Sequence, residues 1–146
     1  LRDRYQGSPY SHACVMRRLL GRVPIVSAGI RSLDEEEHRV SRGEGIRIFY
    51  AHEIRENPNW IADLVSYIET KNVYLTVDVD GLDPSVVPTV GTPEPGGLRW
   101  EETLTLIRSV ADSHKIVGAD VNELCPNPAL PASDFTVAKL CYKIIG

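Results

Sequence analysis

The segment "NVYLTVDVDGLDPSVV", from Asn72 to Val87, joins an apolar run to a group of three carboxylates. The run that opens it is rich in apolar and β-branched residues and has the length of a strand buried in a sheet. Asp78, Asp80 and Asp83 follow at the end of this run. Ligands of open α/β sheets gather at the carboxyl ends of the strands, so the segment predicts both a buried strand and a functional site beside it.

Strand-like and helix-like segments alternate along the rest of the chain. The expected strands are "PIVSAGI" (Pro24–Ile30), "IRIFY" (Ile46–Tyr50), "VYLTVDV" (Val73–Val79) and "KIVGADV" (Lys115–Val121). The expected helices cover residues 11–21, 58–71, 100–114 and 133–146, with Asn57 and Ser133 as N-caps of the second and the last. Alternating strands and helices predict an α/β fold, a three-layer αβα sandwich around a mainly parallel sheet.

Composition places the chain among ordinary globular proteins. Its 146 residues are 42% hydrophobic and 25% charged, which fits one domain over residues 1–146 with a buried core. The net charge of −4 gives no electrostatic reason to expect nucleic acid or an anionic membrane as partner. A small molecule is therefore the expected partner.

The cysteines and the apolar runs bear on the compartment. Cys14, Cys125 and Cys141 are odd in number and show no C-x-x-C spacing, so they predict neither a disulfide framework nor a structural zinc site. No apolar stretch reaches the length of about 20 residues that a membrane span needs. We therefore expect a cytoplasmic protein, with Cys125 serving packing.

The carboxylates of the opening segment need a partner for their charge. On an extended strand Asp78 and Asp80 would share one face, about 6–7 Å apart. Desolvation and mutual repulsion make such a pair costly unless it is protonated, paired or bound to metal. Oxygen ligands suit Mg²⁺, Mn²⁺ or Ca²⁺. The alternative is that the acids shape a turn, and Asp83 before Pro84 has the form of an Asx-turn residue.

A second interpretation is a phosphotransferase. The D-x-D-G pattern of residues 78–81 also resembles the nucleophile motif of haloacid-dehalogenase-like enzymes. That motif usually continues Thr-Leu near the start of a domain, whereas here Leu82 follows in the middle of the chain. This interpretation is kept as the weaker alternative.

Longer motifs resemble one family. "DVDGLDPSVVPTVGTPEPGGL" (Asp78–Leu98), followed by "GADVNELCP" (Gly118–Pro126), resembles the ureohydrolases, the family of arginases and agmatinases. "SPYSHACVMRR" (Ser8–Arg18), "AGIRS" (Ala28–Ser32) and a terminal helix after "SD" agree with it in the same order. The resemblance extends over nearly the whole chain and implies an arginase-like fold.

The resemblance also implies a chemistry. Family members hydrolyse a guanidino group to urea and an amine with two Mn²⁺ ions. Asp78 and Asp80 match the two aspartates of the D-x-D metal motif, and Glu123 matches the glutamate that binds the substrate's guanidinium. His12, in "YSHA", matches the histidine proposed to carry protons to the leaving amine, although Ala13 stands where the family usually has glycine.

Other metal ligands of the family fall outside these residues. They belong to G-G-D-H and D-A-H-x-D motifs, and the latter normally ends just before residues like those that open this chain. The resemblance therefore implies the C-terminal portion of a ureohydrolase domain whose N-terminal part is missing. We expect this portion alone to be inactive and to bind Mn²⁺ weakly. Relatives of this kind are commonly homo-oligomers, either trimers or hexamers.

The loop around His12 bears on the substrate. "GSPYSHA" (Gly7–Ala13) resembles agmatinases more than arginases, whose loop carries an asparagine for the α-carboxylate of arginine. This favours agmatine and a role in polyamine biosynthesis, with guanidinobutyrate or arginine as alternative substrates. A non-catalytic pseudoenzyme or interaction subunit is the alternative from another class.

The remaining candidates have structural interpretations. Three histidines match no family site and are expected on the surface: His38, His52 and His114. Three glycines of the long loop are expected to permit turns and close backbone approach: Gly91, Gly96 and Gly97.

Overall fold

The computed structural model describes residues 1–43 and 45–146 of the chain. It contains the four predicted strands, each within one residue of its expected bounds. These are β1 (Ile25–Ile30), β2 (Ile46–Tyr50), β3 (Asn72–Asp78) and β4 (Lys115–Asn122). Short runs of β-branched and aromatic residues, flanked by turn residues, explain why the strands were predictable.

The helices match the predictions in part. The short segments are the 3₁₀ turn η1 (His12–Cys14), α1 (Val15–Leu19), α3 (Ala51–Glu56), α4 (Trp60–Ser66) and the 3₁₀ turn η2 (Val79–Gly81). The longer helices are α2 (Glu35–Gly43), α5 (Trp100–Ser113) and α6 (Ala132–Ile145). The amphipathic patterns of α5 and α6 predicted both correctly, whereas α2 and α3 were not predicted. None of the helices in the described part of the chain is long and apolar enough to cross a membrane.

A capping box marks the start of α2. The amide of Glu37 donates to Asp34 Oδ1 at 2.8 Å, and the amide of Asp34 donates to Glu37 Oε2 at 3.1 Å. Two amides at the helix start are thereby satisfied reciprocally. The D-x-x-E spacing was thus a signal for a helix that the apolar pattern did not reveal.

Both predicted N-caps were wrong. Asn57 accepts a hydrogen bond from the amide of Asn59 at 2.9 Å in a turn before α4, and α4 begins only at Trp60. Ser133 lies inside the first turn of α6, where its side chain is only 1% exposed. Helix α4 therefore begins later than the sequence predicted, and helix α6 begins earlier.

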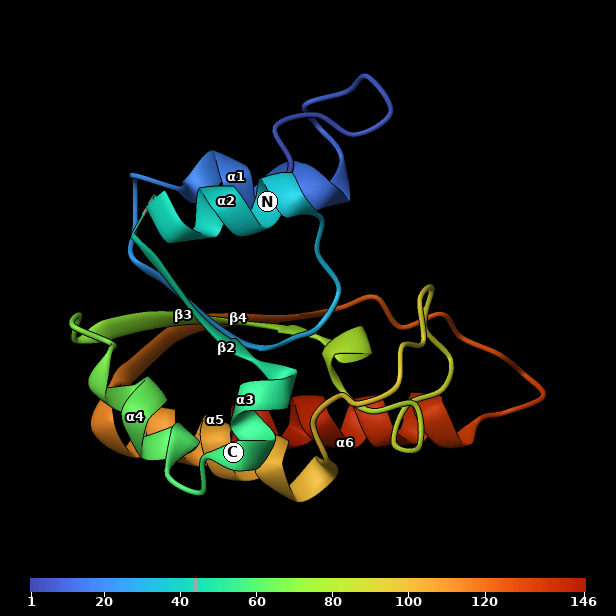
Figure 1. The fold of residues 1–146 in the computed structure, drawn as a ribbon. Helices are drawn as coiled ribbons and strands as arrows, with labels where there is room; N and C mark the ends of the chain where they lie inside the picture. The colour runs from blue at the N-terminus through green and yellow to red at the C-terminus, as the bar shows by residue number, and fades with distance from the viewer. Residues whose placement is uncertain (44) are drawn as a thin grey trace.

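The elements form three layers (Figure 1). Helices α1 and α2 lie on one side of the strands, and α3 to α6 lie on the other. Each crossover, β1–α2–β2 and β3–α5–β4, joins parallel strands. The predicted αβα sandwich with parallel strands is therefore the observed architecture.

The strands pair in two separate ladders. β1 pairs with β2 from Ile25 opposite Ile46, and β3 pairs with β4 from Asn72 opposite Lys115. Within residues 1–43 and 45–146 these pairs form two two-stranded parallel sheets, where the sequence predicted one mainly parallel sheet. Each pair closes through its own crossover, so neither ladder needs the other for its hydrogen bonds.

Two hydrophobic clusters support these ladders. The first lies beneath β3 and β4, where Val79 from η2 and Leu140 from α6 are 0% and 1% exposed. The second joins β2 to α3 and α4 around Phe49 and Trp60. The carboxyl end of β3 is thus fixed from below by a closely packed core.

Candidate functional site

The predicted metal ligands lie where β3 ends and the chain turns. Asp78 is the last residue of β3, and Asp80 lies in the η2 turn that follows. The amide of Asp80 donates to Asp78 Oδ1 at 3.1 Å. The expectation that both side chains project from one face of an extended strand was therefore wrong. The buried side chain of Val79 anchors the turn between them.

The surroundings of Asp78 oppose the ionisation of its carboxyl group. The pKa of its carboxyl group is raised to about 7, first by loss of hydration and then by the negative charge of Asp80, with Glu123 adding to the effect. Asp78 is nevertheless an exposed residue, so its loss of hydration is partial. Because the charges of Asp80 and Glu123 oppose the ionisation of Asp78, a cation beside Asp78 would be favoured.

Asp80 is held by the long loop that follows η2. Thr92 Oγ1 donates to Asp80 Oδ2 at 3.1 Å. This hydrogen bond orients the carboxylate and ties it to the loop. Thr92 was not predicted as a site residue, although it lies in the G-T-P segment of the recognised motif.

Glu123 reaches the same site from β4. β4 ends at Asn122, which lies opposite Asp78 in the ladder. Glu123 then adopts a left-handed backbone conformation with φ of 67°, which is unusual for a residue with a side chain. The next residue, Leu124, forms a bridge with Val90 of the long loop. The fold thus brings Glu123, Asp78 and Asp80 to one edge of the β3–β4 pair.

His12 belongs to a different part of the structure. It opens η1, which continues into α1 on the opposite side of the strands from α5 and α6 (Figure 1). Its Nδ1 lies 3.3 Å from Ser11 Oγ, and its ring packs edge-on against Tyr5 at 5.6 Å between centroids. In the described ranges no hydrogen bond or ion pair joins His12 to the acidic site. The structure brings together three of the four predicted residues.

Asp83 shapes the loop, as the turn interpretation predicted. Its Oδ1 accepts hydrogen bonds from the hydroxyl of Ser85 at 2.6 Å and the amide of Ser85 at 3.0 Å. Its Oδ2 accepts from the amide of Gly96 at 2.8 Å. The Ser85 contacts and the Gly96 amide lower the pKa of Asp83 to about 2. Asp83 therefore closes the loop as a carboxylate.

A polar network that was not predicted lies along the same strands. Thr76 Oγ1 donates to Asp120 Oδ1 at 2.7 Å, and the amide group of Asn122 also donates to that oxygen. The bond from Thr76 lowers the pKa of Asp120, while Asp120 raises the pKa of the Tyr74 hydroxyl. The two-residue spacing of Thr76 and Asp78 on β3 was the available signal.

His38 and His114, two of the three histidines expected on the surface, have hydrogen-bonding partners, whereas His52 is exposed as predicted. His38 Nδ1 lies 3.0 Å from the hydroxyl of Tyr50, and His114 Nδ1 lies 3.0 Å from the carbonyl oxygen of Thr70. Both rings are half-buried. They connect elements of the fold rather than extending freely into solvent.

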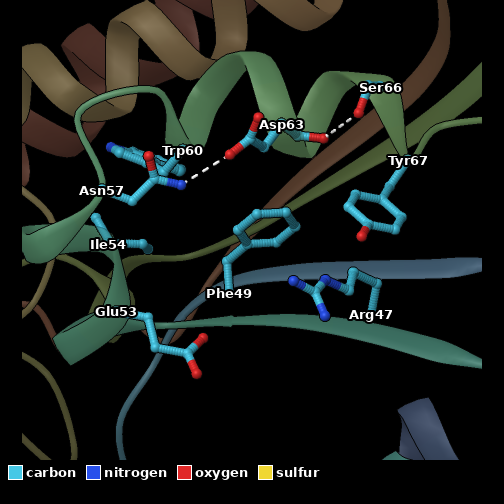
Figure 2. A pocket seen from close by; sticks show the side chains of 9 residues that line it. All are labelled: Arg47, Phe49, Glu53, Ile54, Asn57, Trp60, Asp63, Ser66 and Tyr67. Carbon is cyan, nitrogen blue, oxygen red and sulfur yellow. Dashed lines mark hydrogen bonds between the residues drawn. The ribbon is translucent and has the colours of Figure 1, made fainter.

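A cavity of about 290 Å³ lies between β2, α3 and α4 (Figure 2). The guanidinium of Arg47 lies over the rings of Phe49 and Tyr67, at 5.0 and 4.8 Å from their centroids. Asn57 Nδ2 donates to Asp63 Oδ2 at 2.7 Å on its rim. None of the predicted site residues lines this cavity, so its shape does not bear on the acidic site.

The acidic site offers the kind of ligand that a hard divalent cation prefers, carboxylate oxygens, but too few of them in the described part of the chain to hold the ion. Carboxylate oxygens suit Mn²⁺, and a cation would offset the repulsion at Asp78. Within the described residues, however, no group of three or more acidic, histidine or cysteine side chains is arranged to hold a metal ion. Asp78 and Asp80 by themselves therefore form an incomplete cation site.

Comparison with known proteins identifies relatives of the whole chain. The profile of the arginase family matches residues 1–146. The chain is 44% identical, over its full length, to the N(1)-aminopropylagmatine ureohydrolase of Synechocystis and covers 48% of that protein. It is 37% identical, again over its full length, to the agmatinase of Pyrococcus horikoshii and covers 51% of it.

The solved structures agree with the sequence relatives. The agmatine ureohydrolase of Thermoplasma volcanium aligns with 99% of this chain, with a TM-score of 0.83 and 34% identity. The chain covers 50% of that structure, so it spans about half the length of the relatives it matches. The match over the whole chain leaves the phosphotransferase interpretation without support.

Proposed function

Because the chain belongs to the arginase family, we propose that it forms the C-terminal part of a manganese-dependent ureohydrolase that converts a guanidino compound to urea and an amine. The observation that carries this proposal is the convergence of Asp78, Asp80 and Glu123 at one edge of the β3–β4 pair. Residues 1–146 would then be one portion of a single larger domain. The remaining portion would supply the other metal ligands.

Each acidic residue has a distinct proposed role. Asp78 and Asp80 would hold manganese, and bound manganese supplies Lewis acidity at neutral pH. Glu123 would accept hydrogen bonds from the planar guanidinium of the substrate, which fixes both its charge and its orientation. The left-handed backbone at Glu123 directs this residue away from the regular course of β4.

His12 is proposed to transfer a proton to the leaving amine. Histidine is the side chain that most often acts as a general acid or base in enzymes. Its contacts with Ser11 and Tyr5 would orient the ring. The role requires the complete active site to place substrate between η1 and the acidic residues.

The proposed substrate carries a guanidino group without a neighbouring α-carboxylate. Agmatine is one candidate, favoured by the loop "GSPYSHA" and by relatives named agmatinase. N(1)-aminopropylagmatine is the second, because relatives at 44% and 40% identity bear that name. Arginine and guanidinobutyrate are less favoured. The complete protein is proposed to be a cytoplasmic homo-oligomer.

Urea release by the complete protein with Mn²⁺ tests the proposal. Agmatine, N(1)-aminopropylagmatine, arginine and guanidinobutyrate should be compared by kcat/KM, with one of the first two ranking highest. Asp80→Ala should reduce turnover by more than about 100-fold. Asp112→Ala, which removes an exposed acid from α5, is the matched control and should leave turnover unchanged.

Three results would count against the proposal. Near-normal turnover by Asp80→Ala would remove Asp80 from the metal site. Urea release by the 146-residue chain alone would show that the portion is self-sufficient. A complete protein that releases no urea from any of the four compounds would favour the non-catalytic alternative.

A further inference from the structure

Arg31 follows β1 directly, at a point where the strand departs from regular pairing. The β1–β2 register shifts between Ala28 and Ile30, and the intervening Gly29 has a φ of +78°. A glycine in the left-handed region at such a bulge bends the strand and redirects the side chains that follow. The end of β1 lies beside η2 at this bend. A Cβ added to Gly29 would lie only 3.6 Å from the carbonyl oxygen of Gly81.

The guanidinium of Arg31 bonds to main-chain oxygens on both sides of the acidic turn. Nη2 donates to the carbonyl oxygen of Asp80 at 2.6 Å and to that of Glu94 at 2.7 Å. Nε donates to the same Glu94 oxygen at 3.0 Å. Longer contacts of 3.4–3.5 Å reach the carbonyl oxygens of Gly29, Gly81 and Leu82.

This contact pattern requires arginine. A planar guanidinium carries five donors in a fixed fork, whereas a lysine ammonium has three donors on a single nitrogen. Arg31 uses the fork to join segments that lie 49 and 63 residues away along the chain. Its hydrogen bonds within the described ranges all go to carbonyl oxygens, so it fixes backbone rather than balancing a particular side chain.

The backbone that Arg31 fixes is the backbone of the acidic site. Asp80 is held through its carbonyl by Arg31 and through its carboxylate by Thr92. Glu94, the second carbonyl partner of Arg31, is two residues from Thr92 in the same loop. A shift at Arg31 would therefore move Asp80 and the group that orients it.

We propose that Arg31 is a positioning residue that holds the η2 turn and the 92–94 loop in the arrangement that aims Asp80 at its cation. The link to a cation rests on the proposed function. The clamp, by which we mean the hydrogen bonds from Arg31 to the carbonyl oxygens of Asp80 and Glu94, rests on the contacts of this chain alone.

Amide hydrogen exchange of the metal-free complete protein tests whether Arg31 holds the η2 turn and the 92–94 loop together. Arg31→Lys keeps the positive charge but loses the fork, and it should raise the exchange rates of the Asp83 and Leu98 amides by about tenfold. These amides bond to the carbonyl oxygens of Leu98 and Gly81, at 2.9 and 3.0 Å, just beyond the clamped turn. Arg39→Lys is the control, because Arg39 is 73% exposed in a pair with Glu35 on α2. Equal exchange in Arg31→Lys and wild type would overturn the clamp.

Calorimetric titration of the complete protein with Mn²⁺ tests the link to the cation. Arg31→Lys should weaken Mn²⁺ binding by about 10–100-fold, the usual cost of removing a group that supports a ligand. The urea midpoint of unfolding should stay close to wild type, because the short hydrogen bonds of Arg31 go to the η2 turn and the loop that follows it. Unchanged Mn²⁺ affinity together with faster amide exchange would overturn the positioning role and leave a structural one. Absence of Mn²⁺ binding by the wild-type complete protein would instead overturn the proposed function.

Discussion

Replacing Gly97 by alanine should destabilise the chain because main-chain atoms occupy the space that the new methyl group needs. A Cβ at this position would lie 2.5 Å from both the amide nitrogen of Asp83 and the carbonyl carbon of Leu82. Ordinary contacts of a Cβ begin at 3.4 Å, so the backbone at Gly97 or the backbone at residues 82–83 would have to move by about 1 Å.

The loop has little freedom to make this movement. The amide of Asp83 donates to Leu98 at 2.9 Å, and the amide of Leu98 donates to Gly81 at 3.0 Å, on either side of the contact. Leu82 and Leu98 are also 3% and 8% exposed, so the crossing is packed as well as hydrogen-bonded. Strain and lost hydrogen bonds together should cost about 2–3 kcal/mol.

Urea unfolding followed by circular dichroism measures this cost. With a dependence of about 1–3 kcal/mol per molar urea, the unfolding midpoint of Gly97→Ala should fall by about 0.7–3 M. Gly91→Ala is the matched control in the same loop, because nothing lies within 4 Å of its added Cβ. Its midpoint should stay the same or rise slightly, since alanine restricts the unfolded chain. Equal midpoints for the two variants would refute the reasoning from close backbone contact.

Two further predictions concern charge and core packing. Asp83→Asn should lower the free energy of unfolding by about 1 kcal/mol at neutral pH, a value already reduced for solvent screening. Urea unfolding measures this loss, and Asp112→Asn, at an exposed acid, is the control. The pKa of Asp83 is lowered from 3.8 to about 2, so this stabilisation is present above pH 4 and is lost as the pH falls towards 2. The difference in the free energy of unfolding between wild type and Asp83→Asn should therefore shrink in acid. A difference that grows in acid would contradict the prediction. Leu140→Ala, at a side chain 1% exposed, should cost about 2–5 kcal/mol by thermal or urea unfolding. Ile145→Ala, at a side chain 87% exposed in the same helix, should be nearly neutral, and similar losses in both would contradict the assigned core.

The sequence by itself determined the four strands, α5, α6 and the arginase family. These features depend on neighbours a few residues apart, because strand and helix periodicities and a contiguous motif are local properties. The turn role of Asp83 was predictable for the same reason, since Asp83 bonds to Ser85 only two residues away. By contrast, α2 was missed although its capping box is local, because apolar spacing was the criterion for a helix.

Only the tertiary structure decided how the acidic residues are arranged. The strand pattern placed Asp78 and Asp80 on one extended face, but burial of Val79 in a core shared with α6 favours a turn between them. The approach of Glu123 depends on the pairing of β4 with β3, and the role of Arg31 depends on contacts with Asp80 and Glu94, 49 and 63 residues away. Such contacts form only when distant segments pack together, so no local pattern encodes them.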